Sequence, residues 1–240
     1  MGVAVILLAG GGSTRLGGVR SKVYETVAGR PLLAYSLEVC ALVPAVDRCV
    51  IVIRPDDARP AQLVVESVDV GLMAGTEVSL VVGGRTRHAS EVAGLSVLRS
   101  AVLSGELDTI AIHDAARPFA SVELFERVVA EAGSTGGAIP GIGFDEDLFH
   151  LGSDRPQPLP ADTVVRVQTP QAFGAVDLLR AYDTAPPDFD AVDTAETVAW
   201  AGGVAVAVVP GHTDNIKVTY AEDLVVAERL AKRWRGGGWR

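Results

Sequence analysis

Short apolar runs rich in β-branched residues recur along the chain, and each has the length of one strand. They cover residues 3–8, 49–53, 78–82, 109–113 and 204–209. Each run is apolar almost throughout over five or six residues, a pattern typical of a strand that is covered on both faces. The pattern therefore predicts five buried strands.

The segments between these runs carry apolar residues at helical spacing. Three stripes stand out, formed by Leu32, Leu33, Leu37 and Cys40, by Val92, Leu95 and Leu98, and by Val122, Phe125, Val128 and Val129. Alternation of strands and helices predicts an α/β fold, with a doubly wound, mostly parallel sheet and helices on both faces. Ligands bind such sheets beyond the carboxyl ends of the strands, so the loops after Leu8, Val82 and His113 are the first places to look for a site.

One long stretch follows neither pattern. Residues 141–166 contain three prolines and show no sustained period. A loop of that length in a compact domain is usually functional or reaches a partner. We therefore predict a single domain over residues 1–240 with an inserted arm at about 141–166.

Composition and charge narrow the class of protein. The chain has 240 residues, of which 48% are hydrophobic and 21% charged, which favours a sizeable core over disorder. Its 21 basic and 30 acidic residues give a net charge of −9, which argues against nucleic acid or an anionic membrane as the main partner. Two cysteines are too few for a disulfide framework or a zinc site. The apolar start is too short to span a bilayer, and we expect a cytoplasmic protein.

The first predicted strand runs into a glycine-rich loop, AGGGSTR at residues 9–15. Consecutive glycines let the backbone approach a ligand and direct its N–H groups at phosphate oxygens. Arg15 adds a planar fork for phosphate, and Lys22 adds a mobile charge. The loop is neither a dinucleotide fingerprint nor a Walker A motif, because Arg15 and the Leu-Gly-Gly that follows stand where those patterns need other residues. A tight strand exit with two solvated basic side chains is the alternative interpretation.

A second glycine pair follows the third predicted strand. Gly83 and Gly84 would allow a flat base or sugar to lie against the backbone. Ser90 opens a helical stretch, where it could contact a base edge, although capping the helix is the favoured interpretation.

The fourth predicted strand ends in His113-Asp114-Ala115-Ala116-Arg117. A carboxylate at this point, facing a phosphate loop, is well placed to hold Mg²⁺ and a ribose hydroxyl, the alternative being a cap on the following turn. His113 has apolar neighbours and is interpreted as a hydrogen-bonded core histidine. Arg117 could form an ion pair with Asp114 or bind a second anionic substrate.

A lone lysine, Lys217, stands among apolar residues late in the chain. Its burial would be costly unless it faced an anion or a carboxylate. No Ser-His-Asp, Cys-His or histidine-cluster arrangement is visible in the sequence, which argues against acyl transfer and zinc hydrolysis.

Together these residues suit the transfer of a nucleotidyl group to an anionic acceptor. The attacking oxygen of an acceptor phosphate is already ionised at neutral pH, so no general base is needed. Catalysis then reduces to charge neutralisation and in-line positioning.

Five motifs in order make the interpretation specific. They are LAGGGSTRL with Lys22, GGRTRHASEVAGL, HDAARPF, VQTPQAF and DNIKVTYAEDL. With them the chain resembles the 2-C-methyl-D-erythritol 4-phosphate cytidylyltransferase family from Val3 to about Leu230. The resemblance implies a Mg²⁺-dependent, homodimeric transferase of the nucleotide-diphospho-sugar type, which moves CMP from CTP to a polyol phosphate and releases pyrophosphate in non-mevalonate isoprenoid biosynthesis.

The same resemblance implies a role for each matching residue. The CTP site would comprise Ala9, Gly10, Gly11, Gly12, Ser13, Gly83, Gly84, Ser90, Asp114 and Ala115, with the cytosine on the second glycine pair and Ser90. The acceptor site would comprise Arg117, Thr169, Asp193 and Lys217. Arg15, Lys22, Lys217 and Asp114 would be the catalytic residues, and Asp114 would hold the metal.

The departures from the family pattern lie mainly on the acceptor side. Ser21 stands where the family usually has proline, and Val192–Glu196 retains only the aspartate and alanine of the family's Thr-Asp-x-Ala-Ser. In the arm, the family's Asp-Thr-x-Lys falls near residues 143–146 and its arginine falls near Ala161. Arg155 or Arg166 could substitute for that arginine if the arm folds differently.

These departures leave two alternatives beside the leading hypothesis. One is a ribitol 5-phosphate cytidylyltransferase, which shares the fold and the nucleotide motifs. The other is a CTP-binding homologue that has lost turnover and acts through its arm.

Overall fold

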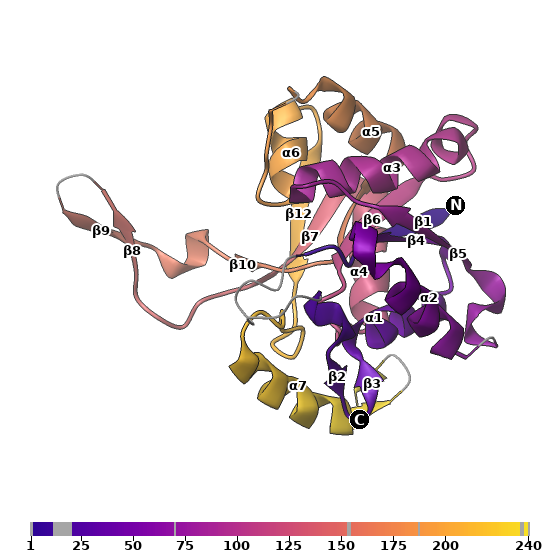
Figure 1. Ribbon diagram of the computed structural model, residues 1–240. Helices are drawn as coiled ribbons and strands as arrows, with labels where there is room; N and C mark the ends of the chain where they lie inside the picture. Colours follow the sequence, from indigo (N-terminus) through magenta and orange to yellow (C-terminus); the bar gives the residue numbers. More distant parts are fainter. Residues whose placement is uncertain are drawn as a thin grey trace.

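A mixed sheet of eight strands forms the centre of the computed structural model, which describes residues 2–11, 21–69, 71–152, 155–186, 188–235 and 238–239 (Figure 1). Its parallel half has the order β6-β1-β4-β5, formed by β6 (Thr109–Asp114), β1 (Val3–Leu8), β4 (Val46–Ile53) and β5 (Glu77–Val82). These four strands confirm the parallel core that the apolar runs predict.

The other half of the sheet is mixed. It contains β11 (Gln171–Gly174), β7 (Gly136–Ile142), β12 (Ala205–Pro210) and β10 (Arg166–Val167). Strand β11 runs antiparallel to both β6 and β7, while β12 pairs with β7 in parallel and β10 pairs with it antiparallel. The apolar run at 204–209 is therefore a strand, as predicted, but its partner β7 is one that the apolar pattern does not reveal.

The prediction that all five runs are buried on both faces is wrong for β5 and β12. Residues along both strands are largely half-buried or exposed, and Val82 and Val208 show 49% and 54% exposure. Both strands lie at edges of the sheet, where one side has no neighbouring strand among the described residues. Apolar composition alone does not distinguish an edge strand from a central one.

Helices cover both faces of the sheet, as predicted. One face carries α1 (Leu32–Leu42), α2 (Ala58–Ser67), α4 (Val122–Thr135) and α7 (Ala221–Arg233), and the other carries α3 (Arg87–Leu103), α5 (Ala175–Thr184) and α6 (Thr194–Ala201). Successive residues of β1 point to opposite faces, so Leu7 joins one apolar core and Ile6 joins the other. This alternation makes β1 the buried centre of both cores.

Short elements complete the described chain. Four are 3-10 turns, namely η2 (Lys22–Tyr24), η3 (Pro55–Asp57), η4 (Leu72–Gly75) and η5 (Ala161–Thr163). Three are two-stranded ribbons, namely β2 (Thr26–Val27) with β3 (Arg30–Pro31), β8 (Leu148–Leu151) with β9 (Pro156–Leu159), and β13 (Trp234–Arg235) with β14 (Gly238–Trp239). No helix in the described ranges has the length and apolar character needed to cross a bilayer.

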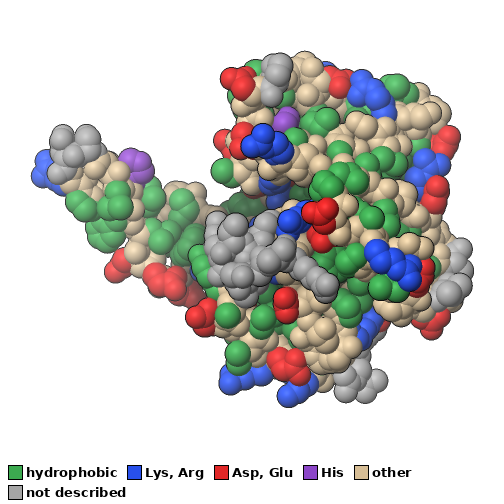
Figure 2. Space-filling view, in the orientation of Figure 1, with side chains coloured by type: hydrophobic (Ala, Val, Ile, Leu, Met, Phe, Trp, Pro, Cys, Tyr) green, Lys and Arg blue, Asp and Glu red, His purple; other side chains and the backbone are tan. Residues whose placement is uncertain are grey.

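The β8–β9 hairpin projects from the body of the molecule (Figure 1). It lies between β7 and β10, within the stretch predicted as an arm. Hydrophobic side chains lie along it in the space-filling view (Figure 2), and Phe149 and Leu151 are 55% and 80% exposed. At its base the guanidinium of Arg166 lies 5.1 Å from the ring centroid of Phe144. The arm thus presents apolar surface away from either core.

Candidate functional site

A cavity of about 500 Å³ opens beyond the carboxyl ends of β1, β5 and β6, the position expected for a ligand on this kind of sheet. Its described lining includes four cationic side chains, Lys22, Arg85, Arg87 and Lys217. Asp114 is the only carboxylate residue among the described lining residues. A cationic cavity in a chain of net charge −9 is suited to a strongly anionic ligand.

Asp114 is the last residue of β6 and is 6% exposed. Its Oδ1 lies 2.5 Å from Arg87 Nη1, and its Oδ2 lies 2.7 Å from Lys217 Nζ and 3.9 Å from Arg117 Nε. Burial alone would raise the pKa of Asp114, but Arg87 and Lys217 outweigh burial and hold the pKa well below its usual range. The carboxyl group is therefore ionised at any pH at which the protein works.

Lys217 faces a carboxylate, as its apolar neighbours in the sequence predict. Lys217 follows a loop that is tied to the segment between β10 and β11, because buried Asn215 in this loop donates from Nδ2 to the Thr169 carbonyl at 2.9 Å. Gln168 donates from Nε2 to the carbonyls of Asn215 and His212. These amide contacts fix the loop, and the half-exposed Lys217 side chain reaches from it to Asp114.

His113 is a hydrogen-bonded core histidine, as predicted. It is fully buried, and its Nε2 lies 3.1 Å from the Arg117 carbonyl, so Nε2 carries the proton and donates it. Nδ1 then accepts from the Thr169 hydroxyl at 2.9 Å. Burial lowers the pKa of His113 to about 4, which keeps the ring neutral.

Thr169 and Arg117 hold the turn after β6. The Thr169 hydroxyl accepts from the Asp114 backbone N–H at 3.0 Å, and Arg117 donates from Nη1 to the Asn215 carbonyl at 2.8 Å. Thr169 is 4% exposed. Both side chains therefore organise the backbone around Asp114 and the Lys217 loop. Their predicted contact with an acceptor phosphate stays a prediction.

Arg87 is a site residue that our sequence analysis does not single out. It is the first residue of α3, and besides Asp114 its guanidinium contacts Glu91, with Nε 2.9 Å from Oε1. Burial lowers the pKa of Arg87, but the two carboxylates outweigh burial and raise it. The helical spacing of the apolar residues in α3 could have shown that Glu91 lies on the buried face of this helix. The buried face of α3 carries Glu91 with Leu95 and Leu98, whereas Val92, predicted on that face, is 39% exposed.

Gly83 and Gly84 are needed for the packing of their own loop. A Cβ on Gly83 would lie 2.7 Å from Ser90 Oγ, and a Cβ on Gly84 would lie 2.3 Å from Ala89 Cβ. The interpretation of Ser90 as the cap of the following helix is wrong, because Thr86 is the N-cap and its Oγ1 accepts from the Ala89 N–H. Ser90 lies one turn later and donates to the Thr86 carbonyl at 2.9 Å. It lines the cavity with Gly84.

Comparison with known proteins decides the family. The family model described as 2-C-methyl-D-erythritol 4-phosphate cytidylyltransferase matches residues 3–233. The chain belongs to that family. A relative named 2-C-methyl-D-erythritol 4-phosphate cytidylyltransferase, from Cereibacter sphaeroides, is 37% identical over 96% of this chain and 97% of its own length.

Solved structures support the same assignment. A 4-diphosphocytidyl-2C-methyl-D-erythritol synthase from Anaerococcus prevotii is 27% identical with a TM-score of 0.81, covering 97% of this chain and 96% of its own. A 2-C-methyl-D-erythritol 4-phosphate cytidylyltransferase from Thermus thermophilus is 29% identical with a TM-score of 0.73. The match covers 97% of this chain and 100% of the Thermus thermophilus chain. The fold described above is therefore that of the cytidylyltransferase family.

Residues 12–16 of the family's first motif lie outside the described residues, and the predicted site residues Gly12, Ser13 and Arg15 are among them. In the described part, Gly10 and Gly11 line the cavity, and buried Ala9 donates its N–H to the Val52 carbonyl at 2.8 Å. Ala115 is buried directly after Asp114. The structure thus brings the described start of the glycine loop and Asp114 to one cavity.

Ser21, which replaces the proline usual in the cytidylyltransferase family, has a clear structural role. Its hydroxyl lies 2.9 Å from the Ala9 carbonyl and 3.3 Å from the Gly11 carbonyl, and it is 1% exposed. A hydroxyl that is buried in this way and contacts both carbonyls ties the start of the glycine loop to the segment that carries Lys22.

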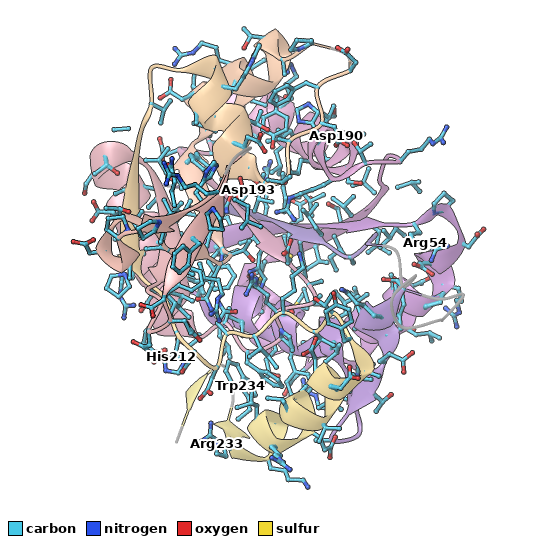
Figure 3. The ribbon with its side chains drawn as sticks, turned by 90° about the vertical axis from the view of Figure 1, so that its left-hand side faces the viewer. Arg54, Asp190, Asp193, His212, Arg233 and Trp234 are labelled. Atoms are coloured by element: carbon cyan, nitrogen blue, oxygen red, sulfur yellow. The ribbon has the colours of Figure 1, made fainter. Side chains whose placement is uncertain are left out.

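Asp193 (Figure 3) is the N-cap of α6. One carboxylate oxygen accepts from the Glu196 N–H at 2.9 Å and the other from Gln171 Nε2 at 3.0 Å. These bonds hold the preceding residue, Val192, in the lining of the cavity. The predicted contact between Asp193 and the acceptor remains untested, while its capping role explains the aspartate structurally.

Proposed function

We propose that this chain transfers CMP from CTP to a polyol phosphate, with 2-C-methyl-D-erythritol 4-phosphate as the leading acceptor, and releases pyrophosphate. Membership of the cytidylyltransferase family supports the reaction. The observation that carries the proposal is the buried carboxylate of Asp114 in the lining of the cavity, with the cationic side chains of Arg87, Arg117 and Lys217 around it. A nucleoside triphosphate and a phosphate acceptor together need such an excess of positive charge.

The proposed step forms one bond and breaks one. A lone pair on an ionised oxygen of the acceptor phosphate forms a bond to the α-phosphorus of CTP. The bond from that phosphorus to the bridging oxygen breaks, and its electron pair leaves with pyrophosphate. Lys22 and Lys217 neutralise the charge that crowds the α-phosphate, with Arg15 on the triphosphate, and no side chain removes a proton.

Asp114 is the residue that would hold Mg²⁺. Mg²⁺ commonly binds one or two carboxylates together with substrate phosphates, and no group of three or more His, Cys, Asp or Glu in the described chain could hold a metal ion. Asp114, in the lining of the cationic cavity, supplies the one carboxylate that this pattern requires, and the triphosphate of CTP would supply the remaining oxygen ligands. When bound, Mg²⁺ would supply further charge neutralisation at the phosphates.

The acceptor is the part of the proposal that most needs a test. Ala161 stands where the family has its arm arginine, and Arg166 lies against Phe144 at the base of the arm. Loss of one charged phosphate contact lowers affinity by roughly tenfold to a hundredfold. These departures favour keeping ribitol 5-phosphate as a second candidate acceptor.

Initial rates of pyrophosphate release with CTP decide between the acceptors. Faster release with 2-C-methyl-D-erythritol 4-phosphate than with ribitol 5-phosphate is the expected result. Faster release with ribitol 5-phosphate would move the proposal to the second acceptor. Tight CTP binding without release for either polyol phosphate would favour a binding protein that has lost turnover.

The arm supports a further part of the proposal, a homodimer of a single-domain enzyme spanning residues 1–240. Its exposed apolar side chains, Phe149, Leu151 and Leu159, need a covering surface. A second copy of the chain could supply this covering surface. We also expect a cytoplasmic location for this enzyme.

A further inference from the structure

A second buried carboxylate lies behind the site. Glu91, on α3, is 0% exposed. It accepts hydrogen bonds from the Tyr182 hydroxyl and from Thr194 Oγ1, the latter at 2.9 Å. These donors come from α5 and α6, so three helices meet at this one carboxylate. Buried carboxylates that serve no purpose are rare because desolvation is expensive, and the reaction proposed above does not use Glu91 directly.

Arg87 lies between this carboxylate and that of Asp114. Its Nη1 is 2.5 Å from Asp114 Oδ1, and its Nε is 2.9 Å from Glu91 Oε1. The Nε contact lacks hydrogen-bond geometry, and buried Nε and Nη2 have no hydrogen-bond partner among the described residues. The guanidinium of Arg87 therefore donates a hydrogen bond to Asp114 from Nη1. Its Nε and Nη2 retain N–H groups that could donate to Glu91.

This arrangement matters because both oxygens of Asp114 are in contact with cations. Arg87 contacts Oδ1 and Lys217 contacts Oδ2. A divalent ion that binds Asp114 therefore competes with these cations for the two carboxylate oxygens. Lys217 can turn to a substrate phosphate, since its side chain is 42% exposed. Arg87 is only 20% exposed, and a buried guanidinium that loses its carboxylate needs another one nearby.

We propose that Glu91 is the alternative partner of Arg87, and that Arg87 turns from Asp114 Oδ1 to Glu91 when Asp114 takes up the metal that accompanies CTP. Glu91 is thus a positioning residue for metal loading. The inference rests on the function proposed above. Hydroxyl donation from Tyr182 and Thr194 keeps the Glu91 oxygens as acceptors, and the charge of Arg87 remains neutralised throughout.

The variant Glu91→Gln tests this role because it keeps the size and hydrogen-bonding capacity of the side chain and removes its charge. Arg87 then has Asp114 as its only carboxylate partner and competes more strongly with the metal. We expect the Mg²⁺ concentration for half-maximal activity to rise about tenfold, with turnover at saturating Mg²⁺ close to that of the unmodified protein.

Glu38→Gln is the matched control. Glu38 is also a largely buried helical glutamate, and Arg30 Nη2 contacts it at 2.7 Å, but neither residue lines the described cavity. This variant should lose stability without a change in metal dependence. An equal shift in both variants would mean that Glu91 is merely structural, and no shift in Glu91→Gln would overturn the inference.

A second readout does not depend on turnover. Mn²⁺ binding, followed by electron paramagnetic resonance with a CTP analogue that cannot release pyrophosphate, should weaken about tenfold in Glu91→Gln. Equal binding in both proteins would overturn the role of Glu91 while leaving the proposed function intact. Absence of Mn²⁺ and nucleotide binding in the unmodified protein would overturn both.

Nuclear magnetic resonance of the unmodified protein covers the case in which Glu91→Gln does not fold. The Arg87 Nε–Hε signal, assigned with Arg87→Lys, should move downfield when Mg²⁺ and the CTP analogue bind, because a hydrogen bond to Glu91 forms. A signal that stays in place on saturation would contradict the proposed movement.

Discussion

At the scale of single residues, the site is an arrangement of charge around one buried carboxylate. Asp114 orders Arg87, Arg117 and Lys217 at distances between 2.5 and 3.9 Å. These cations are gathered at the cavity before a substrate binds, so positive charge is already close to the point where negative charge would develop in the proposed reaction. Preorganised charge of this kind acts mainly on the transition state.

The lysines should therefore affect turnover more than binding. We expect Lys217→Ala and Lys22→Ala each to lower turnover by about a hundredfold while changing the dissociation constant of CTP by no more than about threefold. Stopped-flow turnover and calorimetric CTP titration measure the two quantities. Lys232→Ala, which removes an exposed lysine at the end of α7, is the control. Equal losses in binding and turnover would contradict the role.

His113 predicts a specific dependence of stability on pH. Its pKa is about 4 in the folded protein and about 6.5 in an unfolded chain. Between these values the unfolded chain binds a proton that the folded protein does not, so the free energy of unfolding falls as the pH falls. The contribution of His113 is about 2 kcal/mol between pH 7 and pH 5.

Urea denaturation at pH 7 and pH 5 tests this prediction by comparison with His113→Gln. The variant should lose less stability over this interval than the unmodified protein, by about the same 2 kcal/mol. His88, whose pKa burial also lowers, is present in both proteins and cancels. Parallel pH profiles for the two proteins would refute the assignment.

Single residues could be predicted from the sequence where their immediate neighbours along the chain indicate their surroundings. Lys217 among apolar neighbours predicts an anionic partner, and it contacts Asp114. Asp114 was singled out at a strand end, and it lines the cavity, while its contact with a metal or a ligand stays a prediction. Arg87 and Glu91 are four positions apart on α3 and contact each other, a local spacing that our sequence analysis did not use, but their other partners come from distant segments. Asp114 is 27 positions from Arg87, and Thr194 is 103 positions from Glu91. Local spacing does not encode such pairs.

At the scale of elements, α3 is held close to the sheet by Gly94. A Cβ at this position would lie 2.7 Å from Ile6 Cγ2 and 3.2 Å from Val52 Cγ2. The helix therefore approaches β1 and β4 more closely than an alanine would allow. This approach places Arg87, at the start of the same helix, beside Asp114.

Gly94→Ala should destabilise the protein by about 1–3 kcal/mol, because the added methyl group overpacks the core. Urea denaturation measures the change. Gly75→Ala is the matched control, since nothing lies within 4 Å of a Cβ at that position, and its effect should stay within about 0.5 kcal/mol. A neutral Gly94→Ala would contradict the close packing of α3.

The apolar runs predicted the parallel core because central strands are apolar on both faces. Strand β7 escaped prediction because its sequence, GGAIPGI, combines three glycines and a proline with only three larger apolar residues. Small residues are required there, since a Cβ on Gly137 would lie 2.7 Å from the Phe173 ring. Tertiary packing, rather than local preference, makes this segment a strand.

At the scale of the whole molecule, the arm carries apolar side chains that the body of the protein does not cover. We expect the protein to be a dimer and Leu151→Asp to make it monomeric, because a charge on an apolar interface is costly. Light scattering after gel filtration measures the mass. Leu103→Asp is the control, since Leu103 is 72% exposed on the body and Leu151 is 80% exposed on the arm. A Leu151→Asp variant that remains dimeric would assign the interface elsewhere.

The central claim is that this cationic cavity joins a cytidylyl group to a polyol phosphate. Phosphorus NMR of the protein with CTP, Mg²⁺ and 2-C-methyl-D-erythritol 4-phosphate observes that bond directly. The account predicts that the CTP signals decline together with the acceptor's monophosphate signal, while two coupled diphosphate signals and a pyrophosphate signal appear. Persistence of the monophosphate signal, with CTP intact or merely hydrolysed, would contradict it.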